Sequence, residues 1–438
     1  MKRILIIILS LAIVFGFLFW KFGPSIPIFN RQEPQGPINL TYWGLWEEDT
    51  LIKPLIEKYQ QQNPNVKITY ERKSSINYRT RVQSQIQEGV GPDIFRIHSS
   101  WLKMFLKDNF LSSAPADVFS LAEYKSLFYP VATDAFISNN NQIYAAPMEV
   151  DGLALFYNEE LLNNVGGKVP RNWQEFIDAA NKMTVRDQNG IKTAGAAMGA
   201  ASNVDHWSDI LGLLMLQQPG VDLNNPATDQ AAEVLRFYTG FITDPRKKTW
   251  DVNLPNSTTM FASGRLGFYF APSWRAHELR VANPNLKFKV APVPQLAGKS
   301  VAWASFWAEA VSAKSQNPKE AWKFIKFLTS VESERTFYQE ASKIRLFGEP
   351  YSLVSLSGEL FNDPIVGAFV TQGPIYQFWY LSSNTFDNGV NDQIIKYWED
   401  GVNATLAGTD PQVALQTVGR GVQQVLNELE NQPAATPQ

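Results

Sequence analysis

Residues 38–97 read INLTYWGLWEEDTLIKPLIEKYQQQNPNVKITYERKSSINYRTRVQSQIQEGVGPDIFRI, in which strand and helix patterns alternate. Strand-like alternation of apolar residues occurs at 38–43, 66–70 and 92–97, and helical spacing of apolar residues occurs at 51–59 and 78–88. Strands that alternate with helices form parallel sheets through right-handed crossovers. The N-terminal part of the domain is therefore predicted to be an α/β unit with a parallel sheet.

The remaining chain carries enough further elements for a second unit. Its patterns predict strands at 144–147, 153–157 and within 261–270, an extended segment at 288–294, and helices at 173–183, 229–240, 318–329, 390–407 and 411–430. A chain of 438 residues is long for a single hydrophobic core. We therefore expect two α/β lobes.

Composition excludes several classes of function. The formal net charge of -3 argues against nucleic acid as a partner. The chain has no Cys, which excludes disulfides, thiolate metal sites and cysteine nucleophiles. His98, His206 and His277 are too far apart in sequence for a local metal motif, so no metal site and no cofactor are expected. The 13 Trp residues are an excess, and stacking against a ligand would explain it.

The first residues of the sequence predict a membrane anchor. Met1, Lys2 and Arg3 precede an apolar run that ends in aromatic residues at Trp20. A basic head before such a run is typical of a helix that crosses the membrane with its basic end inside. We expect an uncleaved single-pass anchor at 1–21 and a Pro- and Gly-containing linker at 22–37, with cleavage near Ser25 as the alternative. The C-terminal residues 431–438 are expected to be a disordered tail.

Catalytic motifs are missing from the sequence. It contains no Gly-rich phosphate loop, no nucleophile elbow and no zinc-binding helix pattern. Glu149 and Asp151 form the best pair of carboxylates for a glycosidase. Alternate residues of a strand point to opposite faces, so both would reach one substrate only if the chain bends there. We therefore expect no catalytic residues, and a carbohydrate-active enzyme stays an alternative.

Several motifs together resemble those of a known family. They are Thr41-Tyr42-Trp43-Gly44-Leu45-Trp46, Asn63-Pro64-Asn65-Val66, Gly91-Pro92-Asp93-Ile94, Tyr144-Ala145-Ala146-Pro147, Pro170-Arg171-Asn172-Trp173, Phe261-Ala262-Ser263-Gly264-Arg265, Ser273-Trp274 and Ala291-Pro292-Val293-Pro294. In this order and spacing, residues 38–429 resemble the sugar-binding group of extracytoplasmic solute-binding proteins of ABC importers, which includes the maltose- and glycerol-phosphate-binding proteins. The aromatic segment 346–383 fits the family pattern poorly.

The resemblance implies a type II periplasmic-binding-protein fold with two lobes, each a mainly parallel sheet flanked by helices. The first lobe would comprise 38–150 and about 295–330, and the second 151–291 and about 335–430. Hinges would lie near 149–152, 291–295 and 329–335, where the chain crosses between the lobes.

The resemblance, together with the loops that follow the strands, also indicates ligand-binding residues. Sugars need aromatic platforms and hydrogen-bonding groups around the ring edge. The candidates are Trp46, Glu47, Ser100, Trp101, Asp151, Trp207, Trp274, Arg275 and Trp303. For the aromatic candidates the alternative is packing in the core, and for Glu47 it is a helix-start acid.

The function implied is the capture of a sugar or oligosaccharide outside the cell membrane by closure of the two lobes. Its partners would be the permease subunits of an ABC transporter and, through the anchor, the membrane; the chain itself would be a monomer. The alternative that keeps the fold is a tethered sensory or adhesion module that presents a bound ligand to a receptor. The sequence alone does not identify the sugar.

Overall fold

The computed structural model describes residues 36–431. The predicted anchor at 1–21, nearly all of the predicted linker and the predicted tail therefore lie outside the described residues. Among the described helices, none is long and apolar enough to cross a membrane.

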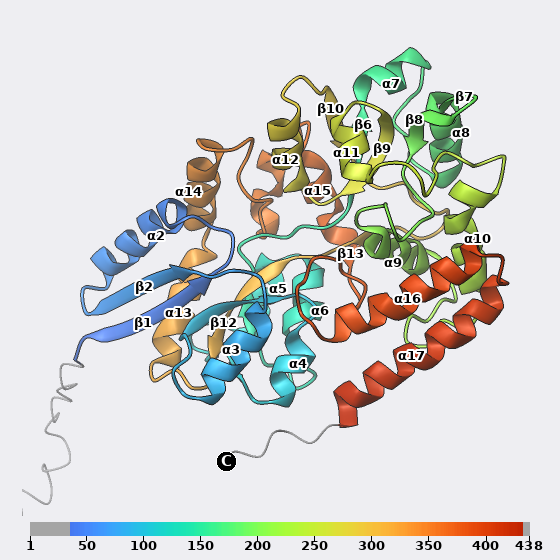
Figure 1. The fold of residues 1–438 in the computed structure, drawn as a ribbon. Coiled ribbons are helices and arrows are strands. Elements are labelled where there is room, and N and C mark those ends of the chain that lie inside the picture. The colour runs from blue at the N-terminus through green and yellow to red at the C-terminus, as the bar shows by residue number, and fades with distance from the viewer. Residues whose placement is uncertain (1–35, 432–438) are drawn as a thin grey trace, which may run out of the picture.

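Two separate sheets organise the fold, one in each lobe (Figure 1). The first sheet has the order β2-β1-β3-β12-β4, with β5 paired to β12. Its strands are β1 (Ile38–Gly44), β2 (Val66–Arg72), β3 (Ile94–His98), β4 (Leu111–Ser112), β5 (Ala145–Ala146) and β12 (Trp307–Ser312). The second sheet has the order β10-β6-β9-β8-β7. Its strands are β6 (Ala154–Asn158), β7 (Val185–Asp187), β8 (Gly190–Ala196), β9 (Leu266–Ala271) and β10 (Phe288–Ala291).

Helices cover both sheets. Those in or near the first lobe are α2 (Asp49–Gln62), α3 (Tyr78–Gln87), α4 (Leu102–Lys107), α5 (Leu121–Leu127), α6 (Pro130–Phe136), α13 (Pro318–Leu328) and α14 (Val331–Ser342). Those in or near the second lobe are α7 (Glu159–Asn164), α8 (Trp173–Met183), α9 (Trp207–Gln217), α10 (Asp229–Thr243), α11 (Ser257–Ala262), α12 (Arg275–Ala282) and α15 (Gly367–Gln372).

The expectation that each sheet is mainly parallel is wrong in detail. In the first sheet β1 pairs with β2 and β3 in parallel, but β12 runs antiparallel to β3, β4 and β5. In the second sheet only the β8–β9 pair is parallel. The cause is the path of the chain: β12 enters the first sheet after the chain has returned from the second lobe, and β7 and β8 form a hairpin at Gly190, whose φ is 109°.

The chain passes repeatedly between the two sheets. It crosses at 147–153, between β5 and β6, and again at 292–306, between β10 and β12. Gly152 is required at the first crossing, because a Cβ atom there would lie 1.9 Å from the carbonyl oxygen of Trp303. In the second crossing β11 (Ala302–Trp303) pairs with β13 (Tyr376–Gln377). Both crossings contain stretches where the sequence predicted hinges.

The last part of the chain departs from the expected division. α14 packs against α2 of the first lobe, although residues from about 335 onward were expected in the second lobe. The chain next reaches the second lobe with α15, which packs against β10. The remaining lobe boundaries stay a prediction.

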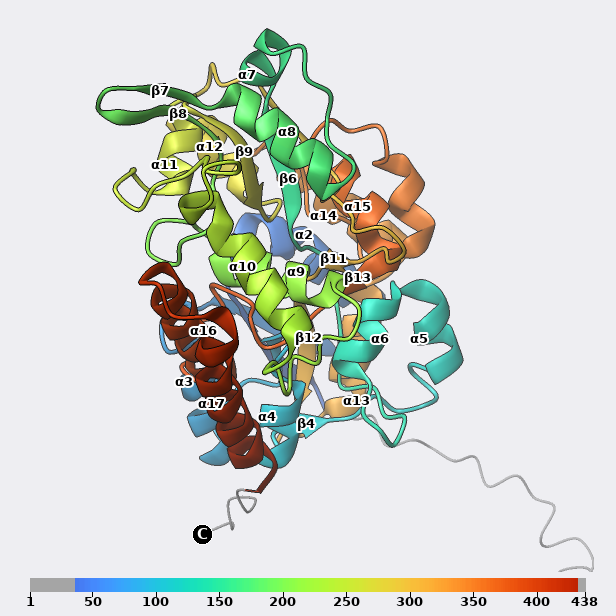
Figure 2. The same cartoon turned by 90° about the vertical axis from the view of Figure 1, so that its right-hand side faces the viewer.

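Two C-terminal helices, α16 (Val390–Leu406) and α17 (Pro411–Asn431), lie side by side and pack against α10 of the second lobe (Figure 2). They also reach the first lobe, because Lys107 of α4 donates a hydrogen bond to the carbonyl oxygen of Glu428 at 3.0 Å. This helix pair therefore touches both lobes.

Candidate functional site

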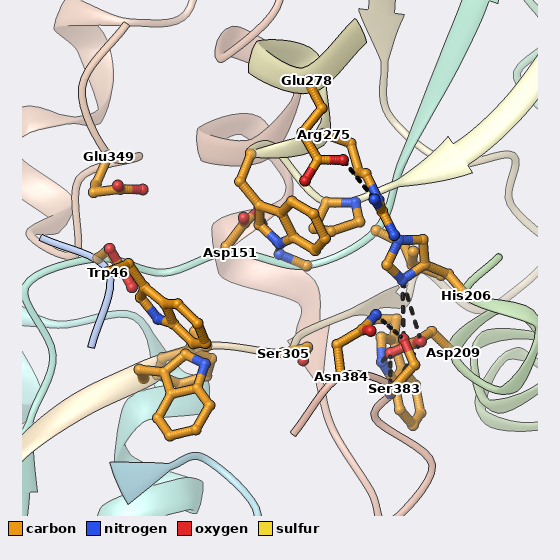
Figure 3. Close-up of a pocket in the computed structure, with 18 of the residues that line it drawn as sticks. Trp46, Asp151, His206, Asp209, Arg275, Glu278, Ser305, Glu349, Ser383 and Asn384 are labelled. Atoms are coloured by element: carbon orange, nitrogen blue, oxygen red, sulfur yellow. Dashed lines mark hydrogen bonds and ion pairs between the residues drawn. The ribbon is translucent and has the colours of Figure 1, made fainter. Parts of the chain in front are cut away.

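A cavity of about 460 Å³ lies among loops and strand ends of both lobes (Figure 3). This volume is within the range of small-molecule sites, roughly 300–1,000 Å³. The lining residues are Trp46, Glu149, Asp151, Gly152, Leu153, His206, Asp209, Pro272, Trp274, Arg275, Glu278, Trp303, Ser305, Phe306, Trp307, Arg345, Glu349, Ser383, Asn384 and Phe386.

Aromatic rings form one wall of the cavity on the side of the first lobe. Trp46 follows β1 and is 43% exposed, which is unusual for so large an apolar side chain. Its ring centroid lies 5.8 Å from that of Trp307 and 6.4 Å from that of Phe386. An exposed indole held by neighbouring rings can stack against the apolar face of a ligand.

The opposite wall comes from the second lobe. Trp274 is followed directly by α12, and its ring carries the guanidinium of Arg275 at 4.3 Å from the centroid. Arg275 also forms an ion pair with Glu278 and donates from Nε to Nε2 of His206 at 3.2 Å. Arg275 is thus fixed by neighbours on both sides, which holds Trp274 at the cavity.

His206 and Asp209 anchor this wall to α9. Since Arg275 can only donate, Nε2 of His206 accepts, and the ring proton lies on Nδ1, 2.9 Å from the hydroxyl of Ser383. Asp209 accepts from Nε1 of Trp303 at 2.8 Å and from the backbone N–H of Ser383 at 3.1 Å. These contacts make Trp303 a fixed, fully buried part of the wall.

Asp151 lies at the first crossing between the lobes and is 7% exposed. Its carboxylate accepts hydrogen bonds from the N–H of Gly152 at 2.7 Å and from the N–H and the hydroxyl of Ser273, the latter at 2.8 Å. Burial raises the pKa of Asp151 to about 7, although these hydrogen bonds oppose the shift. Asp151 thus links the crossing segment to the loop before α12.

A buried ion cluster lies beside the cavity. Arg96 of β3, which is 1% exposed, contacts the carboxylates of Glu47, Glu149 and Glu309. The hydroxyl of Tyr42 donates to Glu309 at 3.1 Å. Within this cluster only Glu149 lines the cavity. The cluster ties the strand ends of the first lobe to the first crossing segment.

Five of the predicted residues line the cavity, namely Trp46, Asp151, Trp274, Arg275 and Trp303. Glu47 does not, because its carboxylate is turned to Arg96. Ser100 is buried and bonded to His98 and to Asn391 of α16 at 2.7 Å.

Two predicted aromatic residues also lie away from the cavity. Trp101 has no exposed surface and stacks on Phe105 at 5.9 Å. Trp207 begins α9 and packs against the core instead. A strand pattern indicates which loop is near the site, but it does not indicate which way each side chain of the loop turns.

Several lining residues were not predicted from the sequence. They are His206, Asp209, Glu278, Ser305, Trp307, Arg345, Glu349, Ser383, Asn384 and Phe386. Some of them come from 345–386, the part of the chain that includes the aromatic segment of poor resemblance. Asn384 and Asn388 were the sequence signal for turns in this segment, because Asn tolerates positive φ angles better than most residues. Both adopt such angles in the structure.

Within residues 36–431, no three His, Asp or Glu side chains gather as a metal site. The cavity itself combines aromatic faces with hydrogen-bonding groups of both kinds. Such an arrangement can hold a small polar molecule with apolar faces.

Comparison with known proteins gives concordant results. The sequence signature of the family described as bacterial extracellular solute-binding proteins matches residues 44–335. An uncharacterised ABC transporter extracellular-binding protein of Pyrococcus horikoshii is 23% identical over 68% of this chain and 68% of its own length. The multiple sugar-binding protein of Streptococcus mutans is 21% identical over 70% of this chain and 74% of its own length.

Solved structures share the fold. A cyclo/maltodextrin-binding protein complexed with maltotetraose superimposes with a TM-score of 0.72 at 17% identity, covering 90% of this chain and 98% of that protein. The sugar-binding protein MalE of Xanthomonas citri gives a TM-score of 0.73 at 18% identity, covering 90% and 98%. The two-lobed architecture is therefore that of periplasmic binding proteins.

Proposed function

We propose a function for this chain from its family: it belongs to the bacterial extracellular solute-binding proteins, whose signature matches residues 44–335. The chain captures a sugar or oligosaccharide outside the cytoplasmic membrane and delivers it to the permease subunits of an ABC transporter. Relatives named as a multiple sugar-binding protein and a galactooligosaccharide-binding protein support this ligand class.

The observation that carries the proposal is the composition of the cavity. Trp46 and Trp274 line the cavity from different lobes. Asp151, Ser305 and Asn384 add hydrogen-bonding groups around the same space (Figure 3). A sugar offers apolar ring faces and a rim of hydroxyls, so it matches both kinds of wall.

The ligand contacts follow from this match. Trp46, Asp151, Trp274 and Arg275 contact the sugar, and Trp303 supports the wall behind it. Glu349, Asn384 and Phe386 complete the site on the remaining sides. Because the walls belong to different lobes, binding draws the lobes together about the crossings at 147–153 and 292–306.

Tethering and oligomeric state complete the proposal. The basic head and apolar run at 1–21 anchor the chain in the cell membrane, with the domain outside. A tether keeps the binding domain near its permease and raises its effective concentration there. The chain acts as a monomer, since residues of its own two lobes line the cavity.

Calorimetric titration and thermal melting of the full chain with neutral maltooligosaccharides, galactooligosaccharides and monosaccharides test the function. We expect saturable binding of at least one sugar and a raised melting temperature, with the sugar recovered intact. Trp274→Ala should weaken that binding on the order of tenfold to a hundredfold, because it removes a stacking platform.

Phe361→Ala is the matched control, since Phe361 is a 51% exposed aromatic that does not line the cavity. It should leave affinity unchanged. Failure of every sugar to bind, or turnover of a bound sugar, would overturn the proposed function. Equal loss in the control would show that Trp274 acts through general stability.

A further inference from the structure

The cavity is lined by more carboxylates than cations. The acidic lining residues are Glu149, Asp151, Asp209, Glu278 and Glu349, and the basic ones are Arg275 and Arg345. Each arginine already has a carboxylate of its own, because Arg275 pairs with Glu278 and Arg345 with Glu349, both at 2.5 Å. Glu149 is paired with Arg96 from behind the wall, at 2.9 Å.

This pairing leaves two carboxylates, Asp151 and Asp209. Asp209 lies 3.8 Å from Nδ1 of His206 and accepts hydrogen bonds from Trp303 and Ser383. In the described part of the chain, Asp151 has no such imidazole beside it.

The hydrogen-bond donors of Asp151 are the N–H of Gly152 and the N–H and hydroxyl of Ser273, which are all neutral. Among the described residues no Lys, Arg or His side chain forms an ion pair with it. The charged neighbour that acts on Asp151 is Glu349, which is itself negative.

This environment disfavours the ionised carboxylate until a cation arrives. Burial and the field of Glu349 both raise the pKa of Asp151, which reaches about 7. A buried charge without a counter-ion is costly, and a ligand that supplies the counter-ion removes that cost. The cavity therefore gains more from a cationic group than from a hydroxyl at this position.

Aromatic faces provide the second element of cation recognition. The face of Trp274 already holds the guanidinium of Arg275. Trp46 and Phe386 are 43% and 40% exposed at the same cavity, with centroids 6.4 Å apart. Ammonium groups are attracted both to such ring faces and to carboxylates.

We propose that the preferred ligand is an amino sugar, whose protonated amine pairs with Asp151 while its ring lies against Trp46 and Phe386. This rests on the proposed function and narrows its ligand class. Sugars that carry phosphate or carboxylate groups are correspondingly disfavoured, because the free carboxylate and its negative neighbour repel them.

A set of ligands matched in shape tests the inference with the full chain. Glucosamine and its β-1,4-linked oligomers are titrated beside glucose and cello-oligosaccharides, and beside the N-acetylated glucosamine series. The pH is about 7, where the sugar amines keep a substantial share of their protons and the Asp151 carboxylate, with a pKa of about 7, can ionise as the ammonium pairs with it. The amine-bearing series should bind about tenfold tighter than its neutral counterparts, as a charge-assisted hydrogen bond exceeds a neutral one. N-acetylation should abolish this advantage without any change in the protein.

The outcomes separate the two claims. Neutral sugars that bind as tightly as amino sugars, or more tightly, overturn this inference and leave the sugar-binding function intact. The same holds if only maltooligosaccharides or galactooligosaccharides bind. Absence of binding by every sugar overturns both.

A matched pair of variants locates the preference. Asp151→Asn keeps the shape of the side chain and removes its charge, so the ratio between amino and neutral sugar should fall to about one. Asp93→Asn, at a carboxylate whose donors, Thr41 and Ser315, are also neutral but which does not line the cavity, should keep the ratio. An unchanged ratio in Asp151→Asn, in a variant whose melting temperature shows that it is folded, places the amine elsewhere and overturns the assignment to Asp151.

Discussion

At the scale of residues, Arg96 is a buried charge held by several partners. It is the cation among the buried carboxylates Glu47, Glu149 and Glu309. One positive charge cannot neutralise three negative ones, and burial opposes ionisation of Glu149 and Glu309. Burial accordingly raises the pKa of Glu309 to about 7 and raises that of Glu149 as well. The cluster thus retains protons at a pH where exposed carboxylates have lost them.

This arrangement predicts a stability that depends on pH through Glu309. Its folded-state pKa of about 7 lies above the unfolded value near 4.3, so the folded state holds the proton more tightly. Stability from this group is present at low pH and is lost as pH rises from about 4 to about 7. Glu309→Gln mimics the protonated form and should keep this stability as the pH rises.

Denaturant unfolding of both proteins at several pH values measures the difference. The free energy of unfolding of the variant should rise relative to that of the unaltered chain by up to about 1.4 kcal/mol per pH unit between about pH 4 and about pH 7. Above that window the difference should stay constant. The curve of the unaltered chain is subtracted from that of the variant because His98 also titrates. Burial lowers the pKa of His98 to about 3, so its contribution to the free energy of unfolding falls as the pH drops below about 6.5, opposite to the trend from Glu309. A difference that is constant with pH would contradict the raised pKa of Glu309.

Sequence reasoning at this scale located loops better than side chains. Trp46, Asp151 and Trp274 line the cavity because each follows or precedes a strand of a sheet. Glu47 and Trp101 come from equally well-placed loops but turn to Arg96 and to Phe105. A single loop residue after a strand has no periodic pattern that fixes its side-chain rotamer. The directions of the Glu47 and Trp101 side chains could therefore not be predicted from the sequence.

At the scale of elements, one segment connects the cavity to both lobes. Residues 382–389, the strap, precede α16. Toward the second lobe, Ser383 contacts His206 and Asp209. Toward the first, the carbonyl oxygen of Asp387 accepts from Arg79, and Asn388 donates to Asn77 at 3.0 Å. Between these contacts Phe386 faces Trp46.

The backbone of the strap is strained at Phe386, whose φ is 53°. An aromatic residue in the left-handed region costs on the order of 1–3 kcal/mol, whereas glycine adopts it freely. Phe386→Gly should therefore be more stable than Phe386→Ala by about 1 kcal/mol, since both remove the ring but only Ala keeps the strain. Both should weaken sugar binding to a similar degree.

Chemical unfolding and titration of the two variants check this prediction. Greater stability of the Ala variant would mean that the strap does not hold the left-handed conformation. Unchanged sugar affinity in both would separate Phe386 from the ligand site. The expected combination, a gain from glycine and a loss of binding, would mark Phe386 as a residue kept for function at a cost in stability.

The long helices and several strands were predicted, whereas short elements such as α4, α5, α6, α7 and α12 were not. The helix at 173–183 was predicted with the bounds of α8, because an Asn172 cap and a regular apolar face fix it. β12 was missed, since a strand buried on both faces does not alternate. α14 was also missed, because the prediction placed a hinge where Ser330 caps a helix instead.

At the scale of the whole molecule, the two-lobed α/β architecture followed from the sequence, while the strand directions within each sheet did not. The direction of β12 depends on where the chain re-enters the first sheet, which is a property of the path and not of any local pattern. The division of the cavity between lobes has the same origin. Trp46 and Trp307 are contributed by the first lobe, and His206 and Trp274 by the second.

A cavity divided in this way predicts compaction on binding. A sugar that touches Trp46 and Trp274 at once favours the arrangement with the lobes closer together, and it shifts the population by its differential affinity for that state. Small-angle scattering should show a smaller radius of gyration at saturating sugar. The melting temperature should also rise, because a sugar concentration a hundredfold above Kd adds about 2.7 kcal/mol to the free energy of unfolding. Trp274→Ala, at a concentration that saturates only the unaltered chain, should show neither effect. An unchanged radius together with full binding would mean that the lobes already stand at their bound separation, and that specificity then rests on the fixed walls and not on closure.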